Sequence, residues 1–242
     1  MTHHGGTHAH THGGAHAQQD PNEDPIAFWE RRYAESDRIW SGRVNQALAA
    51  VTADLVPGKS LDLGCGEGGD VLWFAERGWD ATGIDLSQTA VARAQAEAAD
   101  RGLTGAHFVA ADLADWVAQG SEIDGSDQPF DLITASFMLS PVELPRQQIL
   151  QAALTRLAPG GRLVVLTHVA PPPSMEGNHD FDFLSPAGEL EQLGLGLSED
   201  VREVEGWVVE VAEVREREGA GAGSDEHQHH MEDTVVVVRR TH

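Results

Sequence analysis

Residues 61–70, with the sequence LDLGCGEGGD, constrain the fold of this chain more than any other segment. A short apolar stretch leads to Asp62, four glycines follow within seven residues, and the largely apolar run 71–77 ends at Gly78. This order predicts a strand, a glycine-rich turn and a helix, which is how many nucleotide-binding α/β units begin. Glycine suits such a turn because it bends the backbone tightly and leaves room for a ligand where a Cβ atom would collide.

Asp62 discriminates between two classes of ligand for this turn. Gly64, Gly66 and Gly69 also fit the dinucleotide fingerprint G-x-G-x-x-G, which is a weak signal when it stands alone. A dinucleotide places an anionic pyrophosphate over the turn, where a carboxylate two residues before the first glycine would repel it. S-adenosylmethionine carries a cationic ammonium and sulfonium instead, so Asp62 favours this ligand. The alternative is that the carboxylate only caps local backbone amides.

Size, charge and cysteine content exclude several classes of protein. The 242 residues suffice for one α/β domain, and the net charge of −23 opposes nucleic-acid and anionic-membrane partners. Cys65 is the single cysteine, which rules out a disulfide within the chain and fits a cytoplasmic location. No apolar run approaches the ~18 residues of a membrane span, and no secretory signal is expected.

Composition divides the chain into a tail and one domain. Residues 1–22 are rich in His, Gly, Ala and Thr, so we expect a disordered tail. Histidine-rich tracts can bind metals, as could His227, His229 and His230, but composition alone is weak support and we assign no metal site. Residues 23–242 form the domain, with N-terminal helices at 24–56, the core at 58–168 and a C-terminal part at 169–242.

The periodicity of the domain predicts an α/β fold. We expect helices at 25–35, 43–55, 71–77, 88–100, 113–118, 144–157 and 185–193. We expect strands at 60–63, 79–84, 107–111, 130–135, 162–166, 207–217 and 234–240. Ser87 should cap its helix and Gly102 should end it. The result is a Rossmann-like, seven-stranded, mostly parallel sheet with helices on both faces and a C-terminal antiparallel hairpin.

An acidic residue ends each of the first three predicted strands. These residues are Asp62, Asp85 and Asp112. Asp85 follows Gly66 by 19 residues, close to the ~20 expected for a carboxylate that holds ribose hydroxyls. Asp112 is placed to accept from an adenine amino group. Each could instead be a helix cap, but three successive strand ends after this glycine turn favour a ligand site.

The motifs LDLGCGEGG, GIDLS, AADLAD, FDLITASFMLS and LAPGGRLVVL, in this order over residues 60–168, resemble those of class I S-adenosylmethionine-dependent methyltransferases. The opening FWERRYAESDRIWSGRVN is similar, more loosely, to the N-terminal helices of the thiopurine and tellurite-resistance group of small-molecule methyltransferases. The resemblance implies that Asp85 holds the ribose and that Leu86, Asp112 and Leu113 surround the adenine. It also implies that Asp62, Gly64 and Gly66 line the methionine moiety, that Gly69 supports the turn, and that Ser136 lies next to the methionine with Phe137 nearby. The cofactor-binding residues that it implies are Asp62, Gly64, Cys65, Gly66, Gly69, Asp85, Leu86, Asp112, Leu113, Ser136 and Phe137.

The implied reaction is in-line displacement at the sulfonium methyl, in which the enzyme aligns the reactants and excludes water. No catalytic dyad is visible, and catalytic residues remain unassigned. His168, His179 and Asp180 are candidates for a general base, although ordinary lid residues are the commoner case at such positions.

The predicted acceptor pocket is assembled from Trp29, Tyr33, Trp40, Met138 and residues 171–183. Their aromatic character favours a small, partly hydrophobic acceptor. Trp40 and Arg38 either cover the cofactor or shape the mouth of the pocket. The oligomeric state stays open.

Two other functions fit parts of the sequence. A nonenzymatic S-adenosylmethionine-binding sensor could use the histidine-rich tail for metal, and a nicotinamide-dependent oxidoreductase could use the glycine turn. Asp62 argues against the oxidoreductase, because its charge opposes a pyrophosphate.

Overall fold

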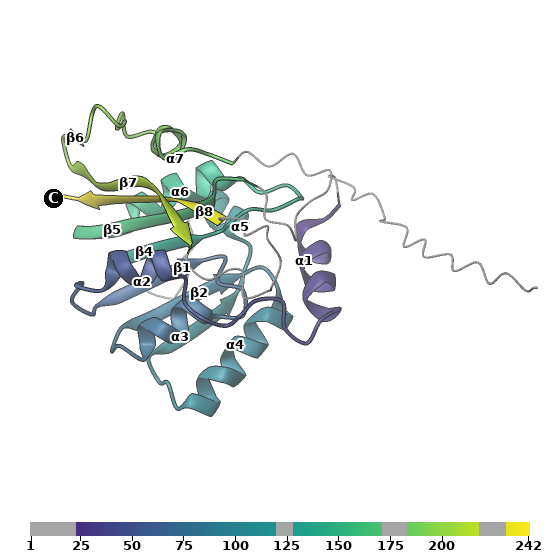
Figure 1. Cartoon of the computed structure of the whole chain (residues 1–242). Helices are drawn as coiled ribbons and strands as arrows, with labels where there is room; N and C mark the ends of the chain where they lie inside the picture. Colours follow the sequence, from purple (N-terminus) through teal and green to yellow (C-terminus); the bar gives the residue numbers. More distant parts are fainter. Residues whose placement is uncertain (1–22, 120–127, 171–182, 218–230) are drawn as a thin grey trace, which may run out of the picture.

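The computed structural model describes residues 23–119, 128–170, 183–217 and 231–242. Its centre is one sheet with the strand order β3-β2-β1-β4-β5-β8-β7-β6 (Figure 1). The strands are β1 (Lys59–Leu63), β2 (Asp80–Asp85), β3 (Ala106–Ala110), β4 (Phe130–Ser136), β5 (Leu157–His168), β6 (Glu203–Val204), β7 (Trp207–Arg217) and β8 (Met231–Arg240). The helices are α1 (Pro25–Ala34), α2 (Gln46–Thr52), α3 (Gly69–Ala75), α4 (Gln88–Arg101), α5 (Leu113–Gln119), α6 (Arg146–Thr155) and α7 (Pro186–Leu193).

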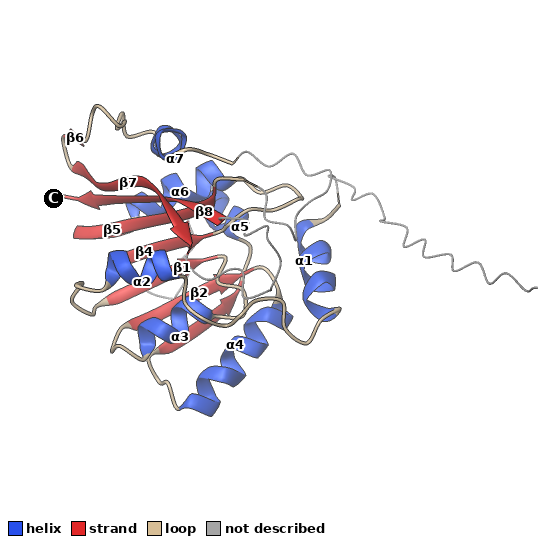
Figure 2. Cartoon of the chain, viewed as in Figure 1, coloured by secondary structure: helices blue, strands red, loops and turns tan. Residues whose placement is uncertain are grey.

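Helices cover both faces of the sheet (Figure 2). Leu48 of α2, Phe74 of α3 and Ala94 of α4 are buried in one apolar cluster. Trp116 of α5 and Leu190 of α7 belong to the cluster on the other face. Burial on both sides explains why the central strands read as continuous apolar runs. The predicted Rossmann-like α/β fold is therefore confirmed.

The strand order places a ligand site at the junction of β1 and β4. The first five strands are parallel, and β1 pairs with β2 on one side and β4 on the other. The connections leave in opposite directions at this junction, and such a switch point is where open α/β sheets bind ligands, at the carboxyl ends of the strands. The strands β7 and β8 pair antiparallel, as predicted, and β8 also pairs antiparallel with β5.

Local sequence signals set the ends of the helices. The Ser87 side chain accepts a hydrogen bond from Ala90 N, and Gly102 ends α4 in the left-handed conformation. Ser185 caps α7 in the same way through Gly188 N, and Gly194 ends that helix. Both predicted helices are confirmed, because a hydroxyl satisfies a free amide at the first turn and glycine tolerates the positive φ at the last.

The sheet has eight strands among the described residues, so the predicted count of seven is wrong. The additional strand is β6, two residues that pair with Trp207 and Val208 across a turn at Gly206. A strand this short leaves no alternation in the sequence. The helix predicted at 43–55 is shorter, because Asn45 caps it, and Pro145 precedes the helix predicted from 144. The strands β5 and β8 are longer than predicted, because Leu157 at the start of β5 pairs with Phe130 of β4 and Met231 at the start of β8 pairs with Arg217 of β7.

Helix α1 lies at the edge of the sheet where the parallel strands end (Figure 1). The Glu30 carboxylate accepts hydrogen bonds from Ser87 Oγ at 2.7 Å and from Thr89 N at 3.2 Å. Trp29 Nε1 donates to Ser140 Oγ, 3.1 Å away, in the loop after β4. These contacts hold α1 over the predicted ligand site. None of the helices in the described part of the chain is long and apolar enough to cross a membrane.

Candidate active site

The glycine turn between β1 and α3 requires glycine for two physical reasons. Gly64, Gly66 and Gly68 have φ values of 71°, 53° and 80°, a region that other residues rarely adopt. A Cβ atom at Gly68 would lie 2.6 Å from the Phe108 ring and 2.9 Å from Ala94 Cβ. The glycines thus permit both the turn and the close packing of α4 and β3 behind it.

Asp62 and Asp70 lie on either side of this turn; Asp62 is buried and Asp70 is half-buried. Asp62 Oδ1 accepts a hydrogen bond from Thr134 Oγ1 at 2.7 Å, and Asp70 Oδ1 accepts from Asn45 N at 3.2 Å. Burial raises the pKa of Asp62 well above its ordinary value, and the charge of Asp70 adds to this, against the bond from Thr134. Burial also raises the pKa of Asp70, against the nearby Ser136 hydroxyl and the bond from Asn45 N.

Asp85, at the end of β2, faces the turn from the other side. Its Oδ2 accepts a hydrogen bond from Gly66 N at 2.8 Å, and its Oδ1 accepts from Ser87 N at 2.9 Å. Burial raises the pKa of Asp85, although these amides oppose the shift. The carboxylate therefore holds the glycine turn against the start of α4, so the capping role considered from the sequence is present at this residue.

The glycine-turn carboxylates, Asp62, Asp70 and Asp85, have no cationic partner within the described ranges. When they are ionised, these three acids without a cation produce a strongly negative potential over the turn. A cationic ligand placed there would replace the missing counter-charge. No cluster of three His, Cys, Asp or Glu side chains arranged for a metal ion occurs in the described segments.

The other predicted cofactor residues lie along the same edge of the sheet. Asp112 Oδ1 accepts a hydrogen bond from Ala114 N at 2.7 Å, and Leu113 is buried in the core cluster beneath it. Ala111 N donates to Asp85 O, which joins the ends of β2 and β3. Cys65 is buried, and burial and the charge of Asp85 raise the pKa of its thiol, so it serves as a packing residue.

Aromatic residues from the N-terminal segment cover the glycine turn. Trp40 Nε1 donates to the Tyr33 hydroxyl at 3.0 Å, and a Cβ atom at Gly66 would meet both side chains within 3.2 Å. The buried Glu67 accepts from Trp40 N, 3.1 Å away, and pairs with Arg93 at 3.0 Å. Trp40 therefore lies against the glycine turn, which is the position expected if it covers the cofactor.

The predicted pocket residues on α1 and after β4 lie along this edge as well. Met138 lies over Gly64, 3.4 Å from the position of a Cβ atom there, and the Trp29 ring lies 6.1 Å from that of Tyr33. Arg38 does not share this position, because it pairs with Glu97 of α4 at 3.8 Å.

A second group of charged residues lies where β5, β7 and β8 meet at this edge. His168 Nδ1 is 3.2 Å from Asp233 Oδ1, and Arg217 Nη2 is 2.7 Å from the same oxygen. Burial alone would raise the pKa of Asp233, but its bonds with His168 and Arg217 outweigh burial and hold the pKa below its ordinary value. We call His168, Arg217 and Asp233 the His168 cluster.

Phe137 connects the two groups. It follows Ser136 at the end of β4, and its φ of 54° is the only positive value outside glycine among the described residues. Its ring stacks on His168 with centroids 4.3 Å apart, and the Arg217 guanidinium lies 4.9 Å from the ring centre. A backbone conformation of this cost persists when the surroundings hold it, and such positions concentrate at functional sites.

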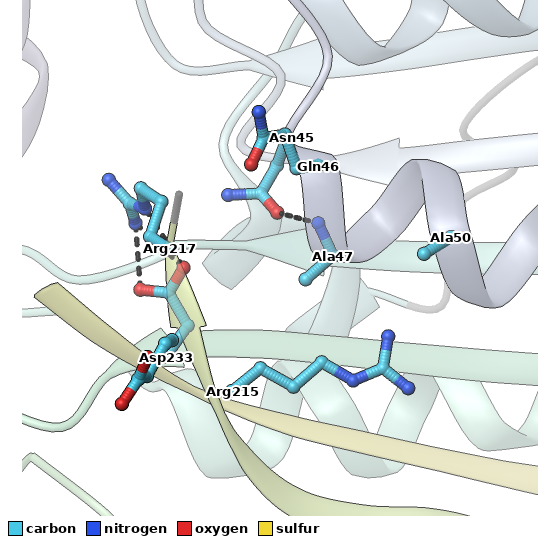
Figure 3. Close-up of a pocket in the computed structure, with 8 residues that line it drawn as sticks. Asn45, Gln46, Ala47, Ala50, Arg215, Arg217 and Asp233 are labelled. Carbon is cyan, nitrogen blue, oxygen red and sulfur yellow. Dashed lines mark hydrogen bonds and ion pairs between the residues drawn. The ribbon is translucent and has the colours of Figure 1, made fainter. Parts of the chain in front are cut away.

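A surface pocket of about 190 Å³ adjoins the His168 cluster. Asn45, Gln46, Ala47 and Ala50 of α2 line one wall, and Arg215, Glu216, Arg217 and Asp233 line the other. Figure 3 shows Arg217 bound to Asp233 opposite the start of α2. Since Asn45 N also binds Asp70, this pocket lies close to the glycine turn.

The structure brings the predicted cofactor residues to one edge of the sheet, and it adds residues that the sequence reasoning missed. The sequence carries only a weak indication of a role for Asp70 and Thr134: Asp70 is an acid in the first turn of a helix, and Thr134 is a polar residue in an apolar strand. Arg217 and Asp233 have none, because only the register of β7 against β8 brings them to His168. His179, Asp180, residues 171–182, the tail 1–22 and His227, His229 and His230 lie outside the described residues.

Comparisons with known proteins agree with this geometry. Residues 61–161 match the methyltransferase domain family. The 2-heptyl-1-hydroxyquinolin-4(1H)-one methyltransferase of Mycobacteroides abscessus is 38% identical over 138 residues, which are 55% of this chain and 57% of that protein. The chain thus spans little more than half the length of this curated relative. Shorter matches include two rRNA methyltransferases, over 20% and 45% of the chain.

Solved structures extend the likeness to most of the chain. A structure from work on the conversion of a disulfide bond into a thioacetal group during echinomycin biosynthesis has a TM-score of 0.62 and 26% identity, over 89% of this chain and 92% of that one. The N-methyltransferase NodS of Bradyrhizobium japonicum, in complex with S-adenosylhomocysteine, has a TM-score of 0.57 and 18% identity, over 90% of this chain and 100% of that one. Residues 61–161 are therefore similar to the methyltransferase domain family, and the glycine turn, the strand order and these matches agree with the predicted resemblance to class I S-adenosylmethionine-dependent methyltransferases.

Proposed function

We propose that this protein transfers the methyl group of S-adenosylmethionine to a small-molecule acceptor. The observation that carries the proposal is the set of glycine-turn carboxylates, two of them buried and one half-buried, which have no cationic partner in the described part of the chain. S-adenosylmethionine would bring an ammonium and a sulfonium to this negative potential. The sulfonium makes the methyl group a target for displacement, and the chain supplies alignment and exclusion of water.

The cofactor-binding residues of the sequence analysis fit this ligand. Asp62 and Asp70 flank the turn where the methionine ammonium would lie, and Ser136 adds a buried hydroxyl without a hydrogen bond of ordinary geometry. That hydroxyl lies near enough to Asp70 to lower the acid's pKa. Asp85 and Asp112 lie farther along the edge, where we place the ribose and adenine. Each carboxylate now accepts a hydrogen bond from a backbone amide, and it would accept from the ligand in addition to that amide or in its place.

The acceptor is proposed to be small and partly apolar. Trp29, Tyr33, Trp40 and Met138 gather beside the turn and offer aromatic and apolar surface. The net charge of −23 disfavours a nucleic acid, although some curated relatives act on rRNA by name. The named substrate of the relative from Mycobacteroides abscessus is a small aromatic ring system with an alkyl chain. A cytoplasmic location and the division into a tail at 1–22 and one domain at 23–242 stay predictions.

Titration calorimetry tests the cofactor and turnover tests the reaction. S-adenosylmethionine and S-adenosylhomocysteine should bind, and NAD should not. Transfer of labelled methyl to a panel of phenols, N-hydroxy heterocycles, thiols and amines should produce S-adenosylhomocysteine. Binding without transfer to any acceptor would favour the sensor hypothesis, and tight NAD binding would contradict the proposal.

A further inference from the structure

His168 is held in a state that suits a general base. Asp233 is buried at 2% exposure and bound by Arg217 through three contacts of 2.7–3.0 Å, so it is ionised and can only accept hydrogen bonds. His168 Nδ1 lies 3.2 Å from Asp233 Oδ1, which can only accept, and 3.4 Å from Arg217 Nη2, which can only donate. We assign the hydrogen from the shorter of these two contacts, the one with the carboxylate. Nδ1 therefore carries the hydrogen and Nε2 keeps its lone pair.

The surroundings of His168 hold its ring in one orientation. The ring stacks on Phe137 with an interplanar angle of 26°, and the bond to Asp233 prevents rotation about the ring axis. Nε2 forms no hydrogen bond with another described residue, although His168 is only 8% exposed. The charged groups around the ring are Asp233 of β8 and Arg217 of β7, which compensate each other. No other carboxylate contacts the ring in the described part of the chain.

Contacts through Phe137 connect His168 with the residues beside the glycine turn. Phe137, which lies against the ring, directly follows Ser136, and Ser136 and Asp70 lie together at the end of the glycine turn. We propose that His168 is the general base of the methyl transfer, that Asp233 is its positioning residue, and that the acceptor carries a weakly acidic hydroxyl. This inference rests on the proposed function.

The step balances without another reactant. The hydroxyl oxygen forms a bond to the methyl carbon while the bond between that carbon and sulfur breaks, and its electron pair stays on sulfur. The hydroxyl proton passes to His168 Nε2 and then to water. The Asp233 carboxylate stabilises the imidazolium in the meantime, as in other carboxylate–histidine pairs. An acceptor that is already ionised needs no such base.

This difference provides the test. We would compare the intact protein with the His168→Gln variant on 2-naphthol, which is protonated at neutral pH, and on 4-nitrophenol, which is largely ionised at pH 8. The variant should lose about 10²-fold or more in kcat/KM on 2-naphthol, and little on 4-nitrophenol. Equal losses on both phenols would overturn the proposal, because a purely structural role does not depend on the protonation of the acceptor.

Matched variants control for folding and for histidine loss in general. His107→Gln removes a histidine that also pairs with a carboxylate, Asp80 at 2.9 Å, but at an exposed site on β3. It should leave both rates unchanged. Asp233→Asn should follow the pattern of His168→Gln, and calorimetric affinity for S-adenosylhomocysteine should be preserved in both.

Transfer by the intact protein to thiols or amines but to neither phenol would overturn the base and leave the proposed function standing. The absence of any transfer would contradict the proposed function itself.

Discussion

Two sets of acids at the same edge of the sheet are built in opposite ways. The glycine-turn carboxylates have amide and hydroxyl donors but no cationic partner in the described segments, and burial raises their pKa values. In the His168 cluster, Asp233 is saturated by Arg217 and His168, and its pKa is lowered. The first set is incomplete without an external cation, whereas the second is complete within the chain.

This difference assigns different tasks to the two regions. A site that lacks its counter-charge loses stability in the free protein and regains it when a cationic ligand binds. A paired site keeps its geometry whether or not a ligand is present. We therefore expect variants of the first region to change ligand affinity, and variants of the second to change stability and the chemical step.

Asp233→Ala should produce the largest loss of stability. It leaves Arg217 without its carboxylate in a partly buried position, which should lower the free energy of unfolding by about 3 kcal/mol. The melting temperature should fall by roughly 6–12 °C for a domain of this size. Thermal unfolding checks this, with Glu232→Ala as the control, since that neighbouring acid is exposed. A melting temperature like that of the intact protein would show that the cluster is not a stabilising unit.

Asp85→Ala should weaken S-adenosylhomocysteine binding by about 1–3 kcal/mol, or roughly 5- to 150-fold. The variant loses the acceptor for Gly66 N and Ser87 N together with the proposed contact to the ribose. Calorimetry measures the affinity. Asp80→Ala is the matched control, because Asp80 is the exposed acid at the other end of the same strand. Equal affinities for both variants would remove Asp85 from the site.

The affinity for S-adenosylmethionine should rise as the pH increases above the ordinary range of a carboxyl group, by up to about tenfold per pH unit for each proton released on binding. The pKa values of Asp62, Asp70 and Asp85 are raised in the free protein, and a bound cation favours their ionised forms. Binding therefore releases protons. Calorimetry in buffers of different ionisation enthalpy counts them. A pH-independent affinity would mean that the acids are already ionised without ligand.

Asp62→Asn should have the smallest effect, a gain of roughly 1 kcal/mol or less in the stability of the free protein at pH 7.5. An acid with a raised folded pKa loses stability as pH increases through its unfolded pKa, and asparagine removes this loss while still accepting from Thr134. The gain should vanish below about pH 4, where the unfolded carboxyl is protonated. Asp54→Asn, at an exposed position, should change nothing at either pH. A stability loss at pH 7.5 would contradict the assigned charge state.

The sequence predicted the fold, and it predicted that Asp62, Asp85 and Asp112 lie at one edge of the sheet, because these features are local; their role in binding a cofactor stays a prediction. The positions of Asp62, Asp85 and Asp112 follow from strand ends, and parallel strands bring their ends to one edge. The His168 cluster was only partly predictable. His168 was a candidate, but its partners Arg217 and Asp233 come from strands whose register depends on tertiary packing. The short β6 and the left-handed Phe137 also leave no periodic signal.

The strand β6 covers only the first residues of β7, and this has a consequence for behaviour at high concentration. From Val211 to Arg217, no described strand lies against the outer side of β7. An open margin of this kind is a template on which another chain can add a strand. Glu213 and Glu216 are exposed along this stretch and place like charges in front of any second copy of the same margin. Replacing both glutamates with glutamine is therefore expected to promote self-association at low salt. The proposed cofactor site, at the ends of the parallel strands, should be unaffected by this change.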